Sequence, residues 1–229
     1  MKRTSAIIEF IGFSGSGKTF ISRHLRDELG AGCILISDVH FNALDVLSYS
    51  LTHPLSIIDT ILFIKSTKQP NRALAFEHIK SIVKYTIRLH KSSKIKHKYV
   101  LIDEGMLHKL RNIRSTSTIK SLPYEDIRPR YRRQLFSKAD IVLHVDAPIE
   151  TIAYRRLKRK HMVPGLAELT NHIARIRPEL EKRAKETLRD IEAAEAERRF
   201  QCIKIYNDDN KPPENMIQYI KGRLSQLES

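Results

Sequence analysis

The stretch GFSGSGKTF, which runs from Gly12 to Phe20, constrains the fold more than any other part of the sequence. It fits the pattern G-x-x-x-x-G-K-[ST], in which glycines let backbone N–H groups wrap phosphates and the lysine reaches the β- and γ-phosphates. An apolar, β-branched run, Ala6–Ile11, precedes it, and an amphipathic helical pattern, Lys18–Leu29, follows it and stops at Gly30. This order of strand, glycine loop and helix predicts that the chain binds a phosphate-bearing ligand.

The residues predicted to contact the phosphates lie in this loop and in the first turn of its helix: Gly12, Ser14, Gly15, Ser16, Gly17, Lys18, Thr19 and Phe20. Lys18 would stabilise the γ-phosphoryl group, and the Thr19 hydroxyl would ligate Mg²⁺. A second metal ligand is expected at the end of another strand, and the run YVLIDE supplies Asp103 for it. We predict that Glu104 positions substrate or water, although either carboxylate could instead cap the next helix.

Short apolar runs alternate with longer amphipathic ones along the 229 residues, which is typical of an α/β domain with a parallel sheet. The five predicted strands are Ala6–Ile11, Cys33–Ser37, Tyr99–Asp103, Ile141–Val145 and Gln201–Tyr206. The predicted helices between them include Phe41–Ser50, Leu51–Ser66, Asn71–His90 and Leu166–Arg199, the last kinked or divided at Pro178. We expect one domain, residues 1–229, with a helical substrate-binding insert at 39–98.

The charge balance indicates an anionic partner, because 41 Lys and Arg outnumber 26 Asp and Glu, giving a net charge of +15. Nucleotides, phosphorylated substrates, nucleic acid and acidic lipid all qualify, and a merely soluble basic surface is the alternative. Cys33 and Cys202 lie in strand-like runs and are expected to be buried thiols. The N-terminus lacks a signal-peptide pattern and no uncharged apolar stretch approaches about 18 residues, so we expect a cytoplasmic protein.

A dense run of positive charge, YRRLKRKH from Tyr154 to His161, follows the fourth predicted strand. Arg155 and Arg159 are four residues apart and therefore share one face of a helix. A transferring phosphoryl group spreads negative charge over its oxygens, and arginines that close over it stabilise that charge. We predict this role for Arg155 and Arg159 in a lid at about 154–165, and a solvated basic helix face is the alternative.

The segments GFSGSGKT, LIDEG and ADIVLHVDAPIETIAYRRLKRK, in this order, resemble the nucleoside-monophosphate-kinase-like P-loop kinases, and most closely their thymidylate kinase and small-molecule kinase branch. The resemblance spans most of the chain and implies a three-layer P-loop NTPase fold, with ATP and Mg²⁺ as cofactors of a phosphotransfer reaction. The D-R-Y signature of thymidylate kinases is absent, because Asp103 is followed by Glu104-Gly105. The resemblance therefore does not extend to a thymidylate substrate.

Further site residues follow from this resemblance. In several small-molecule kinases of the superfamily an Asp at the end of the second strand activates the acceptor hydroxyl, which implies Asp38 as general base, with capping of the next helix as the alternative. The loop after the last strand packs on adenine in such kinases, which implies Asn210 and Lys211. We also predict acceptor contacts for His40, and for Arg128 or Arg132 in a basic cluster, with surface positions as the alternative.

These observations together predict an ATP-dependent phosphotransferase that acts on a small hydroxylated or anionic acceptor, such as a nucleotide, a nucleoside or a sugar-like molecule. A polynucleotide or RNA-end kinase is favoured by the net charge and by the run KSSKIKHK, but opposed by the absence of Trp for base stacking. A third reading is a regulatory protein that hydrolyses ATP slowly and docks on acidic lipid or an anionic glycan. The lack of an N-K-x-D guanine signature argues against a GTPase.

Overall fold

The structure is a computed structural model that describes residues 5–118, 124–132, 139–159, 165–197, 200–208 and 213–228. Within these residues one sheet is formed by β1 (Ala6–Gly12), β2 (Cys33–Leu35), β3 (Tyr99–Ile102), β4 (Ile141–Asp146) and β5 (Gln201–Tyr206). All pairings are parallel, and the order across the sheet is β2-β3-β1-β4-β5. The predicted five-stranded parallel sheet is confirmed.

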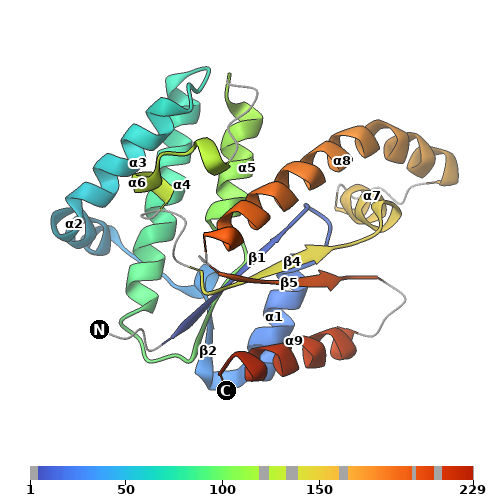
Figure 1. Ribbon diagram of the computed structural model, residues 1–229, viewed down its shortest axis with the longest axis horizontal. Helices are drawn as coiled ribbons and strands as arrows, with labels where there is room; N and C mark the ends of the chain where they lie inside the picture. Colours follow the sequence, from blue (N-terminus) through green and yellow to red (C-terminus); the bar gives the residue numbers. More distant parts are fainter. Residues whose placement is uncertain are drawn as a thin grey trace.

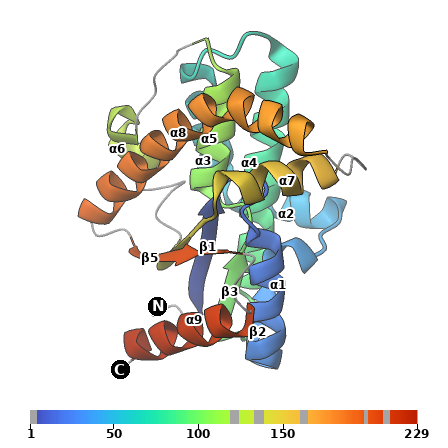
Figure 2. The ribbon, with the colours of Figure 1, turned by 90° about the vertical axis from the view of Figure 1, so that its right-hand side faces the viewer.

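Helices cover both faces of the sheet, so the fold has the predicted three layers (Figures 1 and 2). One face carries α1 (Lys18–Leu29) and α9 (Pro213–Glu228), and the other carries α4 (Arg72–Ser92), α5 (Met106–Thr116) and α8 (Leu166–Ala196). Alternate residues of a strand point to opposite faces, and β1 accordingly sends Ile8 and Phe10 into one core and Ile7 and Ile11 into the other. Burial on both faces explains why the strands read as nearly continuous apolar runs.

Three helices fill the excursion between β2 and β3: α2 (Ala43–Thr52), α3 (Pro54–Ser66) and α4. The boundary predicted at Leu51 is wrong, because α2 continues to Thr52 and α3 starts at Pro54, at an angle of 92° to α2. Proline lacks an N–H group and disfavours helical geometry in the residue before it, so the chain turns at His53 (φ −130°, ψ 48°).

The start of α2 settles one alternative for Asp38. Asn42 caps this helix, since its Oδ1 accepts from the Asp45 backbone N at 3.0 Å while Asp45 Oδ2 accepts from the Asn42 backbone N at 2.9 Å. The capping role considered for Asp38 is therefore wrong.

Within the described residues no single helix is long and apolar enough to cross a membrane, and α2 with α3 passes that test only as a bent pair.

The long helix before β5, α8, packs in the same core as α5. α8 runs unbroken through Pro178, so of the two predicted outcomes, a kink or a division, the division does not occur, and the helix is bent along its length (Figure 1). Asp190 of α8 forms a buried ion pair with Arg114 of α5, with Arg114 Nη2 2.9 Å from Asp190 Oδ1. The same oxygen accepts from the Tyr124 backbone N at 3.1 Å. These bonds fasten α5, which begins just after β3, to α8.

Candidate active site

Polar groups gather at one edge of the sheet because its parallel strands all end there. β1 runs into the glycine loop, β3 into Asp103 and Glu104, β4 ends at Asp146, and β5 is followed by Asn207. β1 lies between β3 and β4, so the loop sits next to both neighbouring strand ends. Open α/β sheets bind their ligands at this edge.

The glycine loop has a backbone that larger residues would not tolerate. Gly12, Gly15 and Gly17 have φ values of 152°, 98° and 95°. A Cβ at Gly12 would lie 2.1 Å from the Val145 carbonyl oxygen, and one at Gly17 would lie 2.0 Å from Asn207 Nδ2. Asn207 Nδ2 donates to the Ser16 carbonyl oxygen at 2.6 Å and so fixes the loop to the end of β5.

Lys18 turns back onto this loop. Its Nζ donates to the carbonyl oxygens of Gly12 at 3.0 Å and Phe13 at 2.9 Å. Burial, followed by the charge of Arg111, lowers the pKa of Lys18 to about 8, while the charges of Glu104 and Asp103 act in the opposite direction. The two carboxylates at the end of β3 therefore lie within electrostatic reach of the lysine.

The predicted lid arginines reach the glycine loop. They belong to α7 (Ile149–Lys158) and its C-cap: Arg155 Nη1 donates to the Gly15 carbonyl oxygen at 3.1 Å, and Arg159 Nη1 donates to Ser14 Oγ at 3.3 Å. Arg156 follows Arg155 in the basic run and was not among the predicted lid residues. Its Nε donates to the Ser14 carbonyl oxygen at 2.8 Å. α7 is held there by apolar contacts of Ile152 and Ala153 with Phe13.

The sequence reasoning did not identify Arg111 as a loop residue. It lies in the second turn of α5, where its Nη1 donates to the Gly12 carbonyl oxygen at 2.9 Å and its guanidinium lies 5.6 Å from the centre of the Phe13 ring. The only available signal was a cation in the helix after Asp103. Asn207 was also missed, because the resemblance assigned the loop after the last strand to Asn210 and Lys211, although Asn207 directly follows that predicted strand.

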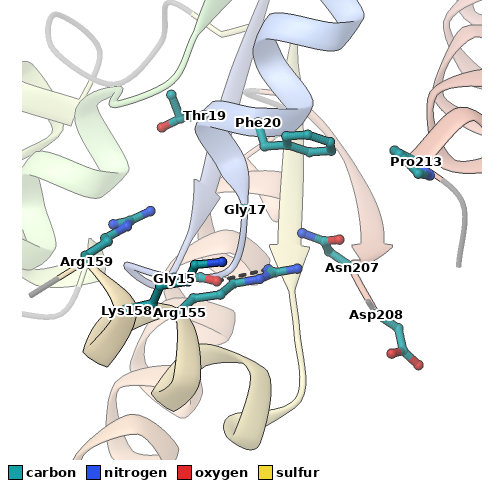
Figure 3. Close-up of a pocket in the computed structure, with 10 residues that line it drawn as sticks. All are labelled: Gly15, Gly17, Thr19, Phe20, Arg155, Lys158, Arg159, Asn207, Asp208 and Pro213. Carbon is teal, nitrogen blue, oxygen red and sulfur yellow. Dashed lines mark hydrogen bonds between the residues drawn. The ribbon is translucent and has the colours of Figure 1, made fainter. Parts of the chain in front are cut away.

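A cavity of about 630 Å³ opens beside the loop (Figure 3). Phe20 of α1 and Pro213 of α9 lie on opposite sides of it, with Asn207 between them and Arg155 near Gly15. Asn210 and Lys211, which the sequence assigns to the adenine site, lie outside the described residues. Their described neighbours Asp208 and Pro213 both line this cavity.

A second cavity, of about 280 Å³, lies against Asp103 and Glu104 and is also lined by Ile36 and Ser37 after β2. Its remaining walls come from α4 and α5. Three cations face it: Lys84, Arg88 and Lys109. Lys109 Nζ donates to Ser81 Oγ at 2.9 Å, and burial lowers the pKa of this lysine.

Four predicted acceptor residues lie elsewhere. Asp38 Oδ2 accepts from Arg26 Nη1 of α1 at 2.7 Å, although the adjacent Ser37 lines the second cavity. His40 and Arg128 are exposed, and Arg132 pairs with Glu197 while its guanidinium lies 5.5 Å from the Tyr124 ring centre. None of these four is among the described residues that line the two cavities. Their roles stay predictions.

A buried carboxyl, Glu9, connects β1 to the segment after β3. Its Oε1 accepts from the Leu107 backbone N at 3.0 Å at the start of α5, and burial raises its pKa to about 7 against the lowering effect of these N–H groups. A Cβ at Gly105 would lie 2.0 Å from Glu9 Cδ, which explains why glycine follows Asp103-Glu104. The sequence pattern did not predict this role, because Glu9 stands alone in an otherwise apolar run.

No protein-family model matches the chain, and no curated protein matches it in sequence. Solved structures do match its fold. Deoxyadenosine kinase from M. mycoides, solved with the products dCMP and a flexible dCDP, is 14% identical over 96% of this chain and 99% of that chain, with a TM-score of 0.51. The same enzyme with bound dATP is 15% identical over 96% of this chain and 100% of that chain, with a TM-score of 0.50. The chain has the fold of a P-loop kinase. This confirms the fold that the sequence resemblance implied.

Glu9 predicts a specific pH dependence of stability. Because its pKa is higher in the folded protein (about 7) than the ordinary value of 4.5, its contribution is fully present below pH 4.5 and is lost as the pH rises towards 7. Glu9→Gln should therefore gain stability relative to wild type between pH 5 and 8, by up to about 3 kcal/mol.

Urea unfolding at several pH values measures this difference. Glu181→Gln, at an exposed position on α8, is the matched control and should follow the wild-type curve. Parallel curves for Glu9→Gln and wild type would show that Glu9 does not titrate in this range.

Proposed function

We propose that the protein is an ATP-dependent phosphotransferase that moves the γ-phosphoryl group to a small acceptor held in the second cavity. The supporting observation is the pair of cavities at the strand ends. One is bounded by the glycine loop and the lid arginines, and the other is bounded by Asp103 and Glu104. A donor and an acceptor placed on these two sides would meet at the loop, where Lys18 lies.

On the donor side, the adenine would lie between Phe20 and Pro213, with the phosphates on the loop. Ser16 Oγ is buried and, within the described part of the chain, has no hydrogen-bond partner, so a phosphate oxygen there would satisfy it. The bonds from Lys18, Arg155 and Arg159 to loop oxygens keep these cations where the γ-phosphoryl group would lie. The M. mycoides kinase of the same fold binds dATP.

The donor set also fits Mg²⁺. Thr19 offers a hydroxyl and Asp103 a carboxylate, which are the oxygen ligands that this ion prefers. Among the described residues no three His, Cys, Asp or Glu side chains form a metal cluster. Magnesium at kinase sites needs only one or two protein ligands besides phosphate oxygens and water, so Thr19 and Asp103 would suffice. The ion would neutralise charge that develops on the phosphates.

On the acceptor side, the charge favours an anion that carries a phosphate or a carboxylate. Lys84, Arg88 and Lys109 face the cavity, and with Mg²⁺ on Asp103, Glu104 would be the one remaining carboxylate among the described residues that line it. The Nε–H of Arg88 is buried and lacks an acceptor among the described residues. A buried guanidinium donor is stabilised by an anionic ligand that accepts from it. A neutral acceptor would leave this excess of positive charge uncompensated.

The acceptor group decides whether a general base is needed. An attacking hydroxyl forms a bond to the γ-phosphorus while the bond to the β-phosphate oxygen breaks, and its proton must leave; an ionised phosphate oxygen has no proton to lose. Asp38 is the proposed base for a hydroxyl. It would have to exchange its bond to Arg26 for one to the acceptor.

The proposed function predicts acceptor-dependent release of ADP. Purified protein with ATP and Mg²⁺ would be screened against nucleosides, nucleoside monophosphates, sugar phosphates and an oligonucleotide with a free 5′-hydroxyl. Lys18→Ala should lower turnover by about 100-fold or more, because a charge aimed at the γ-phosphoryl group is lost. The circular dichroism spectrum of Lys18→Ala should match that of wild type. The control is Lys182→Ala, at an exposed position on α8, which should keep wild-type turnover.

Slow ADP release that no acceptor stimulates would contradict the phosphotransferase and favour the regulatory ATPase. Wild-type turnover in Lys18→Ala would contradict the assigned site. Labelling of the oligonucleotide alone would favour the polynucleotide kinase.

The second cavity predicts a selective defect in Arg88→Met, which keeps an apolar stem but removes the charge. The KM for an anionic acceptor should rise about tenfold or more, while the KM for ATP stays unchanged, since a hydrogen bond to a charged group is lost only on the acceptor side. Lys80→Gln is the control, because Lys80 lies on the same helix, is exposed and pairs with Glu77. Equal changes in both KM values would place Arg88 outside the acceptor site.

For a hydroxyl acceptor, Asp38→Asn should lower kcat by about 100-fold or more, whereas Glu104→Gln should have a smaller effect, since removal of a general base typically slows proton transfer by this amount. The log of kcat against pH should also lose its rising acidic limb in Asp38→Asn alone. If Glu104→Gln shows these changes and Asp38→Asn does not, the base is Glu104, which already lines the cavity.

A further inference from the structure

The outer faces of α2 and α3 carry large apolar side chains in helical register. Leu44, Leu47 and Leu51 recur along α2 at spacings of three and four residues, and Leu55, Ile58 and Leu62 recur in the same way along α3. All six are exposed, and Leu44 and Leu51 expose 73% and 74% of their surface. We call these six residues the apolar elbow, since α2 and α3 meet at 92°.

The apolar elbow is not the core-facing side of these helices. α2 buries Tyr49, and α3 buries Phe63 and Ile64 in the core under the sheet. The exposed face of a helix on a globular domain is normally polar, and a contiguous apolar surface on such a face marks a binding surface. In Figure 1, α2 and α3 lie at the outer edge of the molecule.

The charges around the elbow are positive. Residues 39–76 contain two acidic side chains, and both are paired with a cation: Asp45 with Lys91 at 2.8 Å, and the buried Asp59 with Arg130 at 2.7 Å. The exposed side chain of Lys65 follows Leu62 by three residues and so continues the α3 stripe. Lys68 and Arg72 are also exposed just beyond it.

We propose that the apolar elbow docks on the surface of an anionic lipid bilayer. Leucine and isoleucine side chains would enter the boundary between headgroups and acyl chains, while Lys65, Lys68 and Arg72 pair with anionic headgroups. The net charge of +15 adds long-range attraction to such a surface. The bend suits two helices that lie on a membrane rather than one rod that crosses it.

A second copy of the chain fits this surface less well. A symmetric dimer buries the same patch of both protomers in one interface, so the lysines and the arginine of both copies would gather in that interface. Like charges across an interface oppose association. An anionic bilayer presents the opposite charge and adapts to the shape of the elbow. The proposal does not depend on the phosphotransferase activity.

Cosedimentation with lipid vesicles tests whether the apolar elbow docks on an anionic bilayer. Wild-type protein should bind vesicles of phosphatidylcholine with phosphatidylglycerol at low salt, and bind pure phosphatidylcholine vesicles at least about tenfold more weakly. The double variant Leu44→Ser/Leu51→Ser should lower the partition coefficient on anionic vesicles by about tenfold or more, because apolar burial is lost. Leu166→Ser, at an exposed leucine on α8, is the matched control and should bind as wild type does.

The double variant Lys65→Glu/Lys68→Glu tests the contribution of charge. It should also lower the partition coefficient on anionic vesicles by about tenfold, and Lys182→Glu is its control. Absence of binding to anionic vesicles would overturn the proposal, as would equal losses in the elbow and control variants. Sedimentation velocity without lipid adds a further test. A wild-type dimer that becomes monomeric in Leu44→Ser/Leu51→Ser would assign the elbow to a second copy and overturn the bilayer.

Discussion

The bond between the buried Glu9 carboxyl and the first N–H groups of α5 is the interaction on which the arrangement of the site depends. β1 carries both Glu9 and the glycine loop, and α5 begins directly after Asp103 and Glu104. The carboxyl therefore fixes two strand ends relative to each other from beneath. It also sets the starting direction of α5, and through it the positions of Lys109 and Arg111, which face the second cavity and the loop. A helix N-terminus stabilises negative charge, while burial opposes it, and burial has the larger effect here.

The excess of positive charge has more than one use in this fold. Lys18, Arg111 and the arginines of α7 surround the glycine loop. A second group, on α4 and α5, faces the second cavity, and a third borders the apolar elbow. The positive residues thus form separate groups that suit different anions. The net charge of the chain alone could therefore not distinguish a nucleotide from nucleic acid or lipid. Burial lowers the pKa of Lys18 in the first group and of Lys109 in the second, whereas the cations beside the elbow are exposed.

Local patterns determined which parts of the structure could be predicted from the sequence. The strands and the glycine loop were predictable because their signals, apolar runs and glycine spacing, lie within a few residues. The approach of Arg155 and Arg159 to the loop followed from helix periodicity together with the resemblance. Glu9 and Arg111 were not predictable, since their partners are 98 and 99 residues away and only the sheet brings them together. The break at His53-Pro54 was available in the sequence and was overlooked.

The loop contacts also bear on how a nucleotide would bind. Lys18 and the α7 arginines already donate to loop oxygens, so a bound phosphate would exchange these bonds rather than add to an empty set. An exchange of partners conserves the number of hydrogen bonds, and the gain comes from replacing neutral acceptors with charged ones. Because those cations need not be gathered from solvent, little conformational entropy is lost when the phosphate arrives. In the proposed function the Arg26–Asp38 pair would exchange partners in the same way: the Asp38 carboxylate, which accepts from Arg26 here, would accept from the acceptor when it fills the second cavity.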